Sequence, residues 1–151
     1  MRLFKKLFHW SCSVNYACTV FYPLPAYQMK RLQRLQSACA GFVVRRFAGV
    51  EDVVKLNWLQ VKKNVELNIL KLAHKSLYDH TFPDYLKLQL HSVSAYTLRS
   101  SIAPIFSIPK ESGTFQHSAA SIFNQLPAAI RNIKQYNTFC RSARKHLLNS
   151  E

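Results

Sequence analysis

An amphipathic helix is predicted for Leu24-Pro-Ala-Tyr-Gln-Met-Lys-Arg-Leu-Gln-Arg-Leu-Gln-Ser-Ala-Cys-Ala-Gly-Phe-Val-Val44. Pro25 suits the start of this helix, because the N–H group that proline lacks would have no partner in the first turn. Apolar residues recur within the segment at steps of three and four residues, which predicts a single buried stripe. The members of that stripe are Leu32, Leu35, Cys39 and Phe42.

A second helix is predicted for about 61–80, where the same periodicity returns. Pro83 ends this region, because the residue before a proline avoids the helical conformation. Short helices are predicted for 84–90, 118–124 and 127–133. The buried stripe of the 61–80 helix is predicted to comprise Val61, Val65, Ile69, Leu72, Ala73 and Leu77.

The last predicted helix has Asn137 or Thr138 as its N-cap. Phe139, Ala143 and Leu147 follow at four-residue steps and are predicted to face inward. Ser, Thr and Pro punctuate residues 91–114, which is typical of an irregular or extended connector with room for one short strand. The sequence therefore predicts a mainly α fold, with one small helical domain over 23–150 and an irregular connector around 91–114.

Residues 1–22 form a basic and apolar segment that is open to two interpretations. Leu3, Phe4, Leu7 and Phe8 would share one face of a helix, which fits the first helix of the fold. The alternative is a small basic helical protein held at a membrane surface, or sent to an organelle, by this amphipathic N-terminus. No apolar run of about 18 residues, the length that a membrane span needs, occurs in the sequence.

The positive charge of the chain is unevenly placed. The 151 residues include 21 Lys and Arg against 7 Asp and Glu, for a formal net charge of +14. Residues 1–50 hold eight basic and no acidic side chains, 51–112 hold eight basic and six acidic, and 113–151 hold five basic and one acidic. Charge clustered at two ends favours a polyanionic partner such as RNA, DNA or an anionic membrane surface. The alternative is that the charge serves solubility alone.

The residue patterns of common enzymes are missing from the sequence. Three glycines are too few and too scattered for the loops that cradle phosphates in nucleotide-binding enzymes. The polymerase pattern Tyr-x-Asp-Asp and the hydrolase pattern Gly-x-Ser-x-Gly do not occur. The adjacent acids Glu51 and Asp52 fit the positive end of a helix dipole. The sequence predicts no catalytic residue, no cofactor and no small-molecule substrate.

The four cysteines are Cys12, Cys18, Cys39 and Cys140, and none forms a Cys-x-x-Cys pair. No histidine lies at zinc-finger spacing from two of them, so no metal site is predicted. Their irregular spacing does not resemble a disulfide framework. Reduced thiols inside a cell, in the nucleus or the cytoplasm, are the simpler interpretation.

A series of short motifs begins at Arg31-Leu-Gln-Arg-Leu-Gln-Ser-Ala-Cys-Ala40 and continues with Leu56-Asn-Trp-Leu-Gln-Val61. Next come Leu70-Lys-Leu-Ala-His-Lys-Ser-Leu-Tyr-Asp79, Phe82-Pro-Asp-Tyr-Leu86, Leu98-Arg-Ser-Ser101 and Gly113-Thr-Phe115. The series ends with Phe123-Asn-Gln-Leu-Pro127, Arg131 and the helix that holds Phe139. In this order, over about residues 13 to 149, it resembles the region behind the polymerase thumb in reverse transcriptases of LINE-type non-LTR retrotransposons. The chain departs from the family pattern at Gln60, Asn64 and Phe123, where proline, arginine and tryptophan are usual.

This resemblance implies a non-catalytic C-terminal fragment of an RNA-directed DNA polymerase, without its palm, fingers and endonuclease. The catalytic carboxylates would then lie upstream of Met1, and none of the matched motifs transfers a catalytic residue. The distribution of charge independently predicts nonspecific contact with the RNA or DNA backbone at two basic groups. One group comprises Lys30, Arg31, Arg34, Arg45 and Arg46, and the other comprises Arg141, Arg144 and Lys145.

Overall fold

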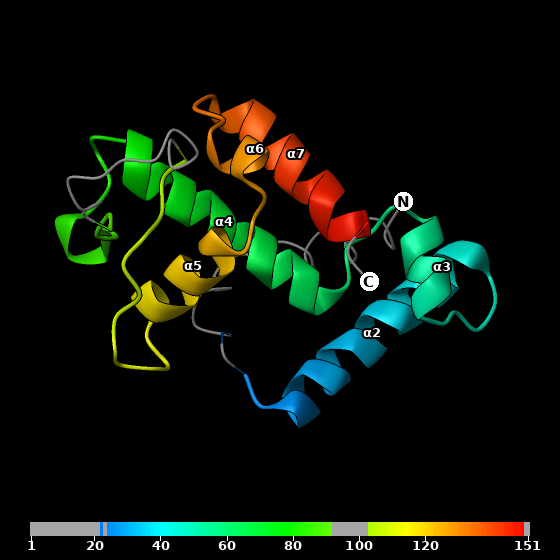
Figure 1. The fold of residues 1–151 in the computed structure, drawn as a ribbon. Coiled ribbons are helices and arrows are strands. Elements are labelled where there is room, and N and C mark those ends of the chain that lie inside the picture. The colour runs from blue at the N-terminus through cyan, green and yellow to red at the C-terminus, as the bar shows by residue number, and fades with distance from the viewer. Residues whose placement is uncertain (1–21, 23, 92–102, 150–151) are drawn as a thin grey trace.

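The computed structural model describes residues 22, 24–91 and 103–149, and this part of the chain is mainly α-helical (Figure 1). The mainly α class predicted from the sequence is confirmed. The predictions for residues 1–21, for the Leu98–Ser101 motif and for part of the connector fall outside the described residues. The helices are α2 (Ala26–Val44), α3 (Val50–Lys55), α4 (Val61–Tyr78), α5 (Phe115–Asn124), α6 (Ala128–Arg131) and α7 (Tyr136–Asn149), with a 3-10 turn η1 (Asp84–Leu86).

The core forms where α5 and α7 pack against α4, and Figure 1 shows these three helices gathered together. Phe123 of α5 lies between Phe106 and Phe139, with ring centroids 4.8 and 6.2 Å away. All three rings are buried. Phe139, Ala143 and Leu147 face inward as predicted, and Val61, Val65, Ile69 and Ala73 of the predicted α4 stripe are buried.

The predicted buried face of α4 is partly wrong. Leu72 and Leu77 are only half-buried, whereas Leu67, Leu70 and His74 are buried. The reason is that α4 is enclosed on several sides: it packs against α2 as well as against α5 and α7. A helix with neighbours on several sides buries more than one narrow stripe.

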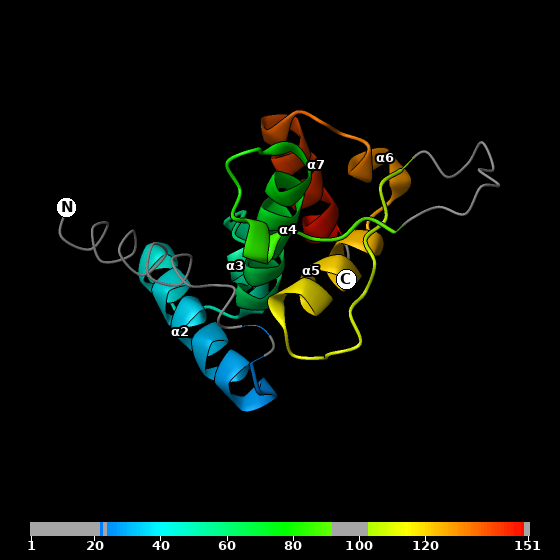
Figure 2. The same ribbon diagram turned by 90° about the vertical axis from the view of Figure 1, so that its left-hand side faces the viewer.

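The predicted buried stripe of α2 is partly wrong, since Leu32 and Cys39 are only half-buried and the other two members are exposed. Leu35 and Phe42 are 54% and 69% exposed, and the buried residues of this helix are Gln36 and Ala40. Figures 1 and 2 show α2 on one side of the bundle and reaching past it. The α2 face that carries the buried Gln36 and Ala40 is turned about 120° to 160° from Phe42, counting 100° per residue.

The segments between the helices correct several predicted boundaries. The helix predicted for 84–90 is only the η1 turn, and the chain then extends to an isolated antiparallel bridge between Leu90 and Phe106. The α5 helix begins at Phe115, ahead of the predicted Ser118, because the Thr114 side chain accepts a hydrogen bond from the His117 N–H. The predicted N-caps Asn137 and Thr138 lie inside α7, which already begins at Tyr136.

Candidate functional site

The first three predicted basic residues, Lys30, Arg31 and Arg34, are exposed on α2. At 100° per residue they fall within about 100° of one another, and Arg31 and Arg34 lie about 120° or more from the buried Gln36 and Ala40. The α2 helix therefore presents its cations on the face turned away from the core. This part of the predicted interface is a contiguous strip.

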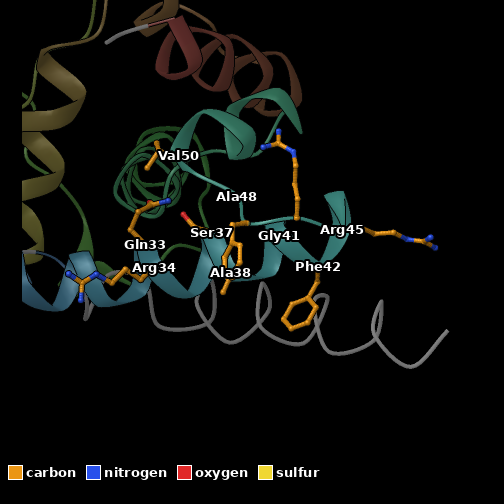
Figure 3. A pocket seen from close by; sticks show the side chains of 11 residues that line it. Gln33, Arg34, Ser37, Ala38, Gly41, Phe42, Arg45, Ala48 and Val50 are labelled. Carbon is orange, nitrogen blue, oxygen red and sulfur yellow. The ribbon is translucent and has the colours of Figure 1, made fainter.

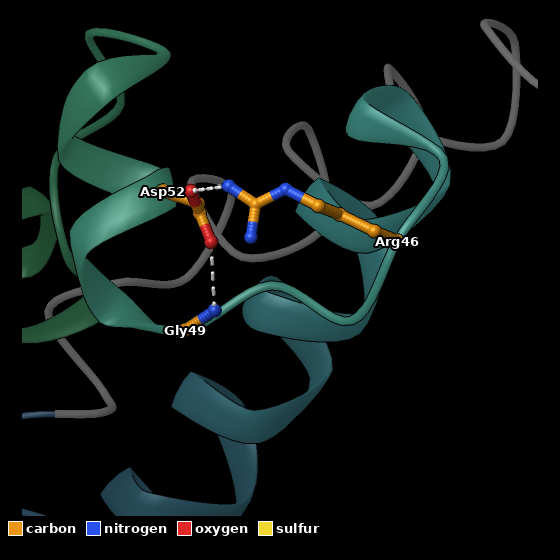
Figure 4. A network of polar contacts seen from close by, with 3 residues as sticks. All are labelled: Arg46, Gly49 and Asp52. Atoms are coloured by element: carbon orange, nitrogen blue, oxygen red, sulfur yellow. Dashed lines mark hydrogen bonds and ion pairs between the residues drawn. The ribbon is translucent and has the colours of Figure 1, made fainter.

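Arg45 and Arg46 lie in the turn after α2. Arg45 adopts the left-handed conformation, with φ of 55°, and ends the helix. Its side chain points away from the helix in Figure 3. Arg46 turns back instead: its Nη2 lies 2.5 Å from Oδ1 of the nearly buried Asp52. The second oxygen of Asp52 accepts a hydrogen bond from the Gly49 N–H at 3.1 Å (Figure 4).

Asp52 therefore caps α3 and neutralises Arg46 at the same time. This is the helix-start role predicted for the Glu51 and Asp52 pair, since both acids lie in the first turn of α3. The ion pair also removes part of the charge of Arg46 from the predicted interface. Among the eight predicted site residues, Arg46 is the one with an ion pair in the described part of the chain.

The second basic group, Arg141, Arg144 and Lys145, is exposed on α7. Arg144 reaches across to the turn after α3, where its Nη2 donates a hydrogen bond of 2.8 Å to the Asn57 carbonyl. One member of each basic group thus contacts α3 or the turn that follows it. Lys30 and Arg31 lie far from α3, near the start of α2. At 1.5 Å per residue, Lys30 is about 20 Å along the helix axis from Arg45 at its end.

A hollow that the sequence did not predict lies along α2 and the turn that follows it. Its volume is about 730 Å³, and Arg34 and Arg45 lie at its two ends in Figure 3, with Phe42 beside Arg45. The run Arg45-Arg-Phe47, in which a large aromatic residue follows two arginines, is the part of the sequence that could have indicated this site. In the structure Phe47 is fully exposed. The lining residues are Gln33, Arg34, Ser37, Ala38, Gly41, Phe42, Arg45, Arg46, Phe47, Ala48 and Val50.

Gly41 allows the turn beside this hollow to close tightly. A Cβ at this position would lie 2.8 Å from the Arg46 carbonyl oxygen, which is closer than atoms in contact tolerate. The Gly41 carbonyl accepts the Arg46 N–H at 3.1 Å, so the chain folds back onto the end of α2. The positions of Arg45, Arg46 and Phe47 depend on this close approach.

The glutamines of the Arg31–Ala40 motif hold α2 to the start of α4. Gln36 is buried and donates a hydrogen bond of 2.7 Å to the Leu59 carbonyl. Gln33 accepts the Val61 N–H at 3.0 Å and donates to Gln36 at 2.9 Å. Two of the quoted motifs, 31–40 and 56–61, therefore contact each other through a polar clamp.

The Phe123–Arg131 motif holds the connector in a similar way. The Asn124 amide accepts the Phe106 N–H and donates to the Phe106 carbonyl, both at 2.9 Å. The Arg131 guanidinium donates to the carbonyls of Leu126 and Pro104, both at 3.0 Å. The polar residues of this motif satisfy backbone groups that a loop would otherwise leave unpaired.

His74 is a packing residue. Its ring stacks on Phe139 with centroids 4.4 Å apart, and its Nε2 lies 2.8 Å from the Ile133 carbonyl. A carbonyl only accepts hydrogen bonds, so Nε2 carries the proton. Burial lowers the pKa of His74, and the hydrogen bond to Ile133 opposes this shift. The neutral ring is therefore the form that the core accommodates.

Glu66 is the half-buried acid of α4. Burial raises the pKa of Glu66, and the nearby Lys62 and Lys63 oppose that shift. Three or more metal-binding side chains do not meet anywhere in the described ranges, 24–91 and 103–149. The same ranges contain no helix long and apolar enough to span a membrane.

The chain has no significant match among family models, curated proteins or solved structures. Its own geometry is therefore the basis for a functional proposal. The eight predicted cations are all exposed, and five of them border or continue the outer face of α2.

Proposed function

We propose that the chain is a non-catalytic C-terminal segment of a LINE-type reverse transcriptase that holds RNA or DNA nonspecifically by its phosphates. The observation that carries the binding role is the exposed strip of Lys30, Arg31 and Arg34 on α2, continued by Arg45 at the end of the helix. Cations on one helix face can neutralise successive phosphates.

The proposed origin is supported by contacts between the quoted motifs. Gln33 and Gln36 of one motif bond to the backbone of Leu59 and Val61 in the next. Asn124 and Arg131 bond to the segment that contains Phe106. The motif residues thus hold separate segments of the fold together. Motifs that were inherited with a fold are expected to have this role. A reading frame with a Tyr-x-Asp-Asp motif in the DNA upstream of Met1 is the expected finding, and its absence would argue against this origin.

Binding is tested by titrating the full chain with a fluorescent DNA duplex at several salt concentrations. Each neutralised phosphate contributes about −0.9 to the slope of log K against log salt, so all eight cations would give about −7. Arg46 and Arg144 already have partners within the protein, and we expect a slope of about −5 from the other six. A slope near zero, or no binding at low salt, would contradict the proposal.

A triple variant locates the interface. Lys30→Gln, Arg31→Gln and Arg34→Gln together should reduce the slope by about 2.7, because three phosphate contacts are lost. The matched control removes the same charge from the nearly neutral middle, through Lys62→Gln, Lys87→Gln and Lys110→Gln. If the control weakens binding as much as the α2 variant does, total charge rather than the α2 strip is responsible.

A further inference from the structure

The outer face of α2 carries aromatic side chains as well as cations. Tyr27 is 64% exposed and lies within about 20° of Arg34 around the helix axis, at 100° per residue. Phe42 is 69% exposed and lies about 80° from Arg34, and Phe47 follows in the turn, fully exposed. Apolar surface that is rimmed by charged residues is typical of interaction sites, and here Phe42 and Phe47 line one hollow together with arginines.

The hollow beside these rings has the size and lining of a ligand site. Its volume of about 730 Å³ falls within the range of small-molecule pockets, about 300 to 1,000 Å³. Ala38, Gly41 and Ala48 give it small apolar walls, and Phe42 and Phe47 line it as well. Its described lining residues include no acid, and Arg34 and Arg45 supply charge that no ion pair within the described ranges neutralises, so an anionic ligand with a flat apolar part is favoured.

We propose that this face binds single-stranded nucleic acid, with bases stacked on Phe42 and Phe47 and phosphates at Arg34 and Arg45. The inference rests on the proposed function and defines its ligand more narrowly. In a duplex both faces of nearly every base are covered by neighbouring bases, whereas a single strand can place a base against an aromatic ring. Base-on-aromatic stacking next to a positively charged track is the general basis of sequence-independent single-strand binding.

Two other ligands fit the chemistry less well. An anionic membrane would attract the arginines, but a concave hollow gives a flat lipid surface little to contact. An acidic peptide would pair with the arginines. Its apolar side chains would pack equally well whether the hollow were lined by aliphatic or by aromatic residues. Stacking differs from both because it requires the ring itself, so replacing Phe by Leu separates the three ligands.

The test compares a single-stranded DNA of about 12 nucleotides with the same sequence as a duplex, using the full chain and fluorescence anisotropy. The double variant Phe42→Leu with Phe47→Leu retains apolar bulk and removes the rings. We expect it to weaken single-strand binding by about tenfold or more and to leave duplex binding within about twofold. The double variant with Trp at both positions should restore single-strand binding.

Controls separate the inference from the proposed function. Tyr85→Leu removes an aromatic side chain that is 79% exposed and does not line the hollow, and it should change neither affinity. If the Leu variant binds the single strand as tightly as the unmodified chain does, while duplex binding keeps its salt slope, the inference fails and the proposed function stands. If neither DNA binds, both fail. Binding to vesicles of phosphatidylserine and phosphatidylcholine that survives in the Leu variant, with no single-strand binding, would overturn the inference in favour of a membrane.

Discussion

The packed bundle of α4, α5 and α7 and the outer face of α2 use the same residue type in opposite ways. In the bundle, Phe123 and Phe139 are enclosed together with Phe106 of the connector, and the Phe123 ring lies next to both of the others. On the α2 side, Phe42 and Phe47 are left in solvent beside arginines. The difference teaches that apolar residues at helical spacing mark a face, and that the neighbours of the helix decide whether that face becomes core or surface.

The largest effect on stability is expected when one ring is removed from the bundle, and the matched change on the outer face of α2 should have little effect. Phe123→Ala leaves a cavity among packed aromatic rings and is expected to lower the free energy of unfolding by about 3 to 5 kcal/mol. Phe42→Ala on the exposed face should lower it by less than about 0.5 kcal/mol. Urea unfolding followed by circular dichroism measures both. Equal losses in the two variants would mean that Phe42 is packed in solution, and the contrast between the regions would be lost.

The polar clamp that joins the two regions gives an intermediate effect. Gln36→Ala leaves the Leu59 carbonyl without its buried donor, and we expect a loss of about 1 to 3 kcal/mol in the free energy of unfolding. Gln28→Ala, at a more exposed site on the same helix, is the matched control and should cost little. If the two variants unfold at the same urea concentration, the hydrogen bond from Gln36 does not hold α2 in place.

The smallest effect is a pH dependence confined to the bundle. The pKa of His74 is lowered in the folded protein, from 6.5 in the unfolded chain. At a pH between the folded and unfolded pKa of His74, the unfolded chain binds more protons than the folded protein. The contribution of His74 to the free energy of unfolding is therefore fully present above pH 6.5 and is lost as the pH falls toward the folded pKa. His74→Gln keeps a hydrogen-bond donor but does not titrate, so its stability should change less with pH in this window.

Urea midpoints of both proteins at several pH values below 6.5 provide the measurement. Glu66 titrates in both, so its contribution cancels in the comparison. An identical pH dependence in the two proteins would mean that His74 is equally easy to protonate in the folded and unfolded chains. In that case the burial of its ring in the bundle would have to be reconsidered.

The sequence predicted the bundle well because its helices pack by apolar periodicity. Phe139, Ala143 and Leu147 repeat every four residues and are all buried. The failure at α2 has a physical cause: Gln36 counts as polar in any pattern, yet it is buried because its amide meets the Leu59 carbonyl 23 positions away. A periodicity compares residues within one helix and contains no information about such a distant partner.

The candidate site was predictable in its charges and not in its shape. All eight predicted cations are exposed, because charged side chains remain at the surface unless they are paired. Which of them have partners depends on folding: Arg46 meets Asp52, and Arg144 meets the Asn57 carbonyl in the turn after α3. The hollow depends on the close return of the chain at Gly41, and a lone glycine at the end of a helical pattern does not specify that path.

The Asn124 side chain forms hydrogen bonds with both the N–H and the carbonyl of Phe106. In a β-sheet a neighbouring strand would satisfy these two backbone groups. Together with the Arg131 bond to Pro104 and the bridge to Leu90, the Asn124 side chain fastens the connector around Phe106, and positions 107–113 beyond it are exposed. Because lengthening a loop costs little free energy, this stretch can gain or lose residues during evolution while the attachment persists. The attachment around Phe106 thus allows the length of the 107–113 stretch to change without disturbing the packed helices.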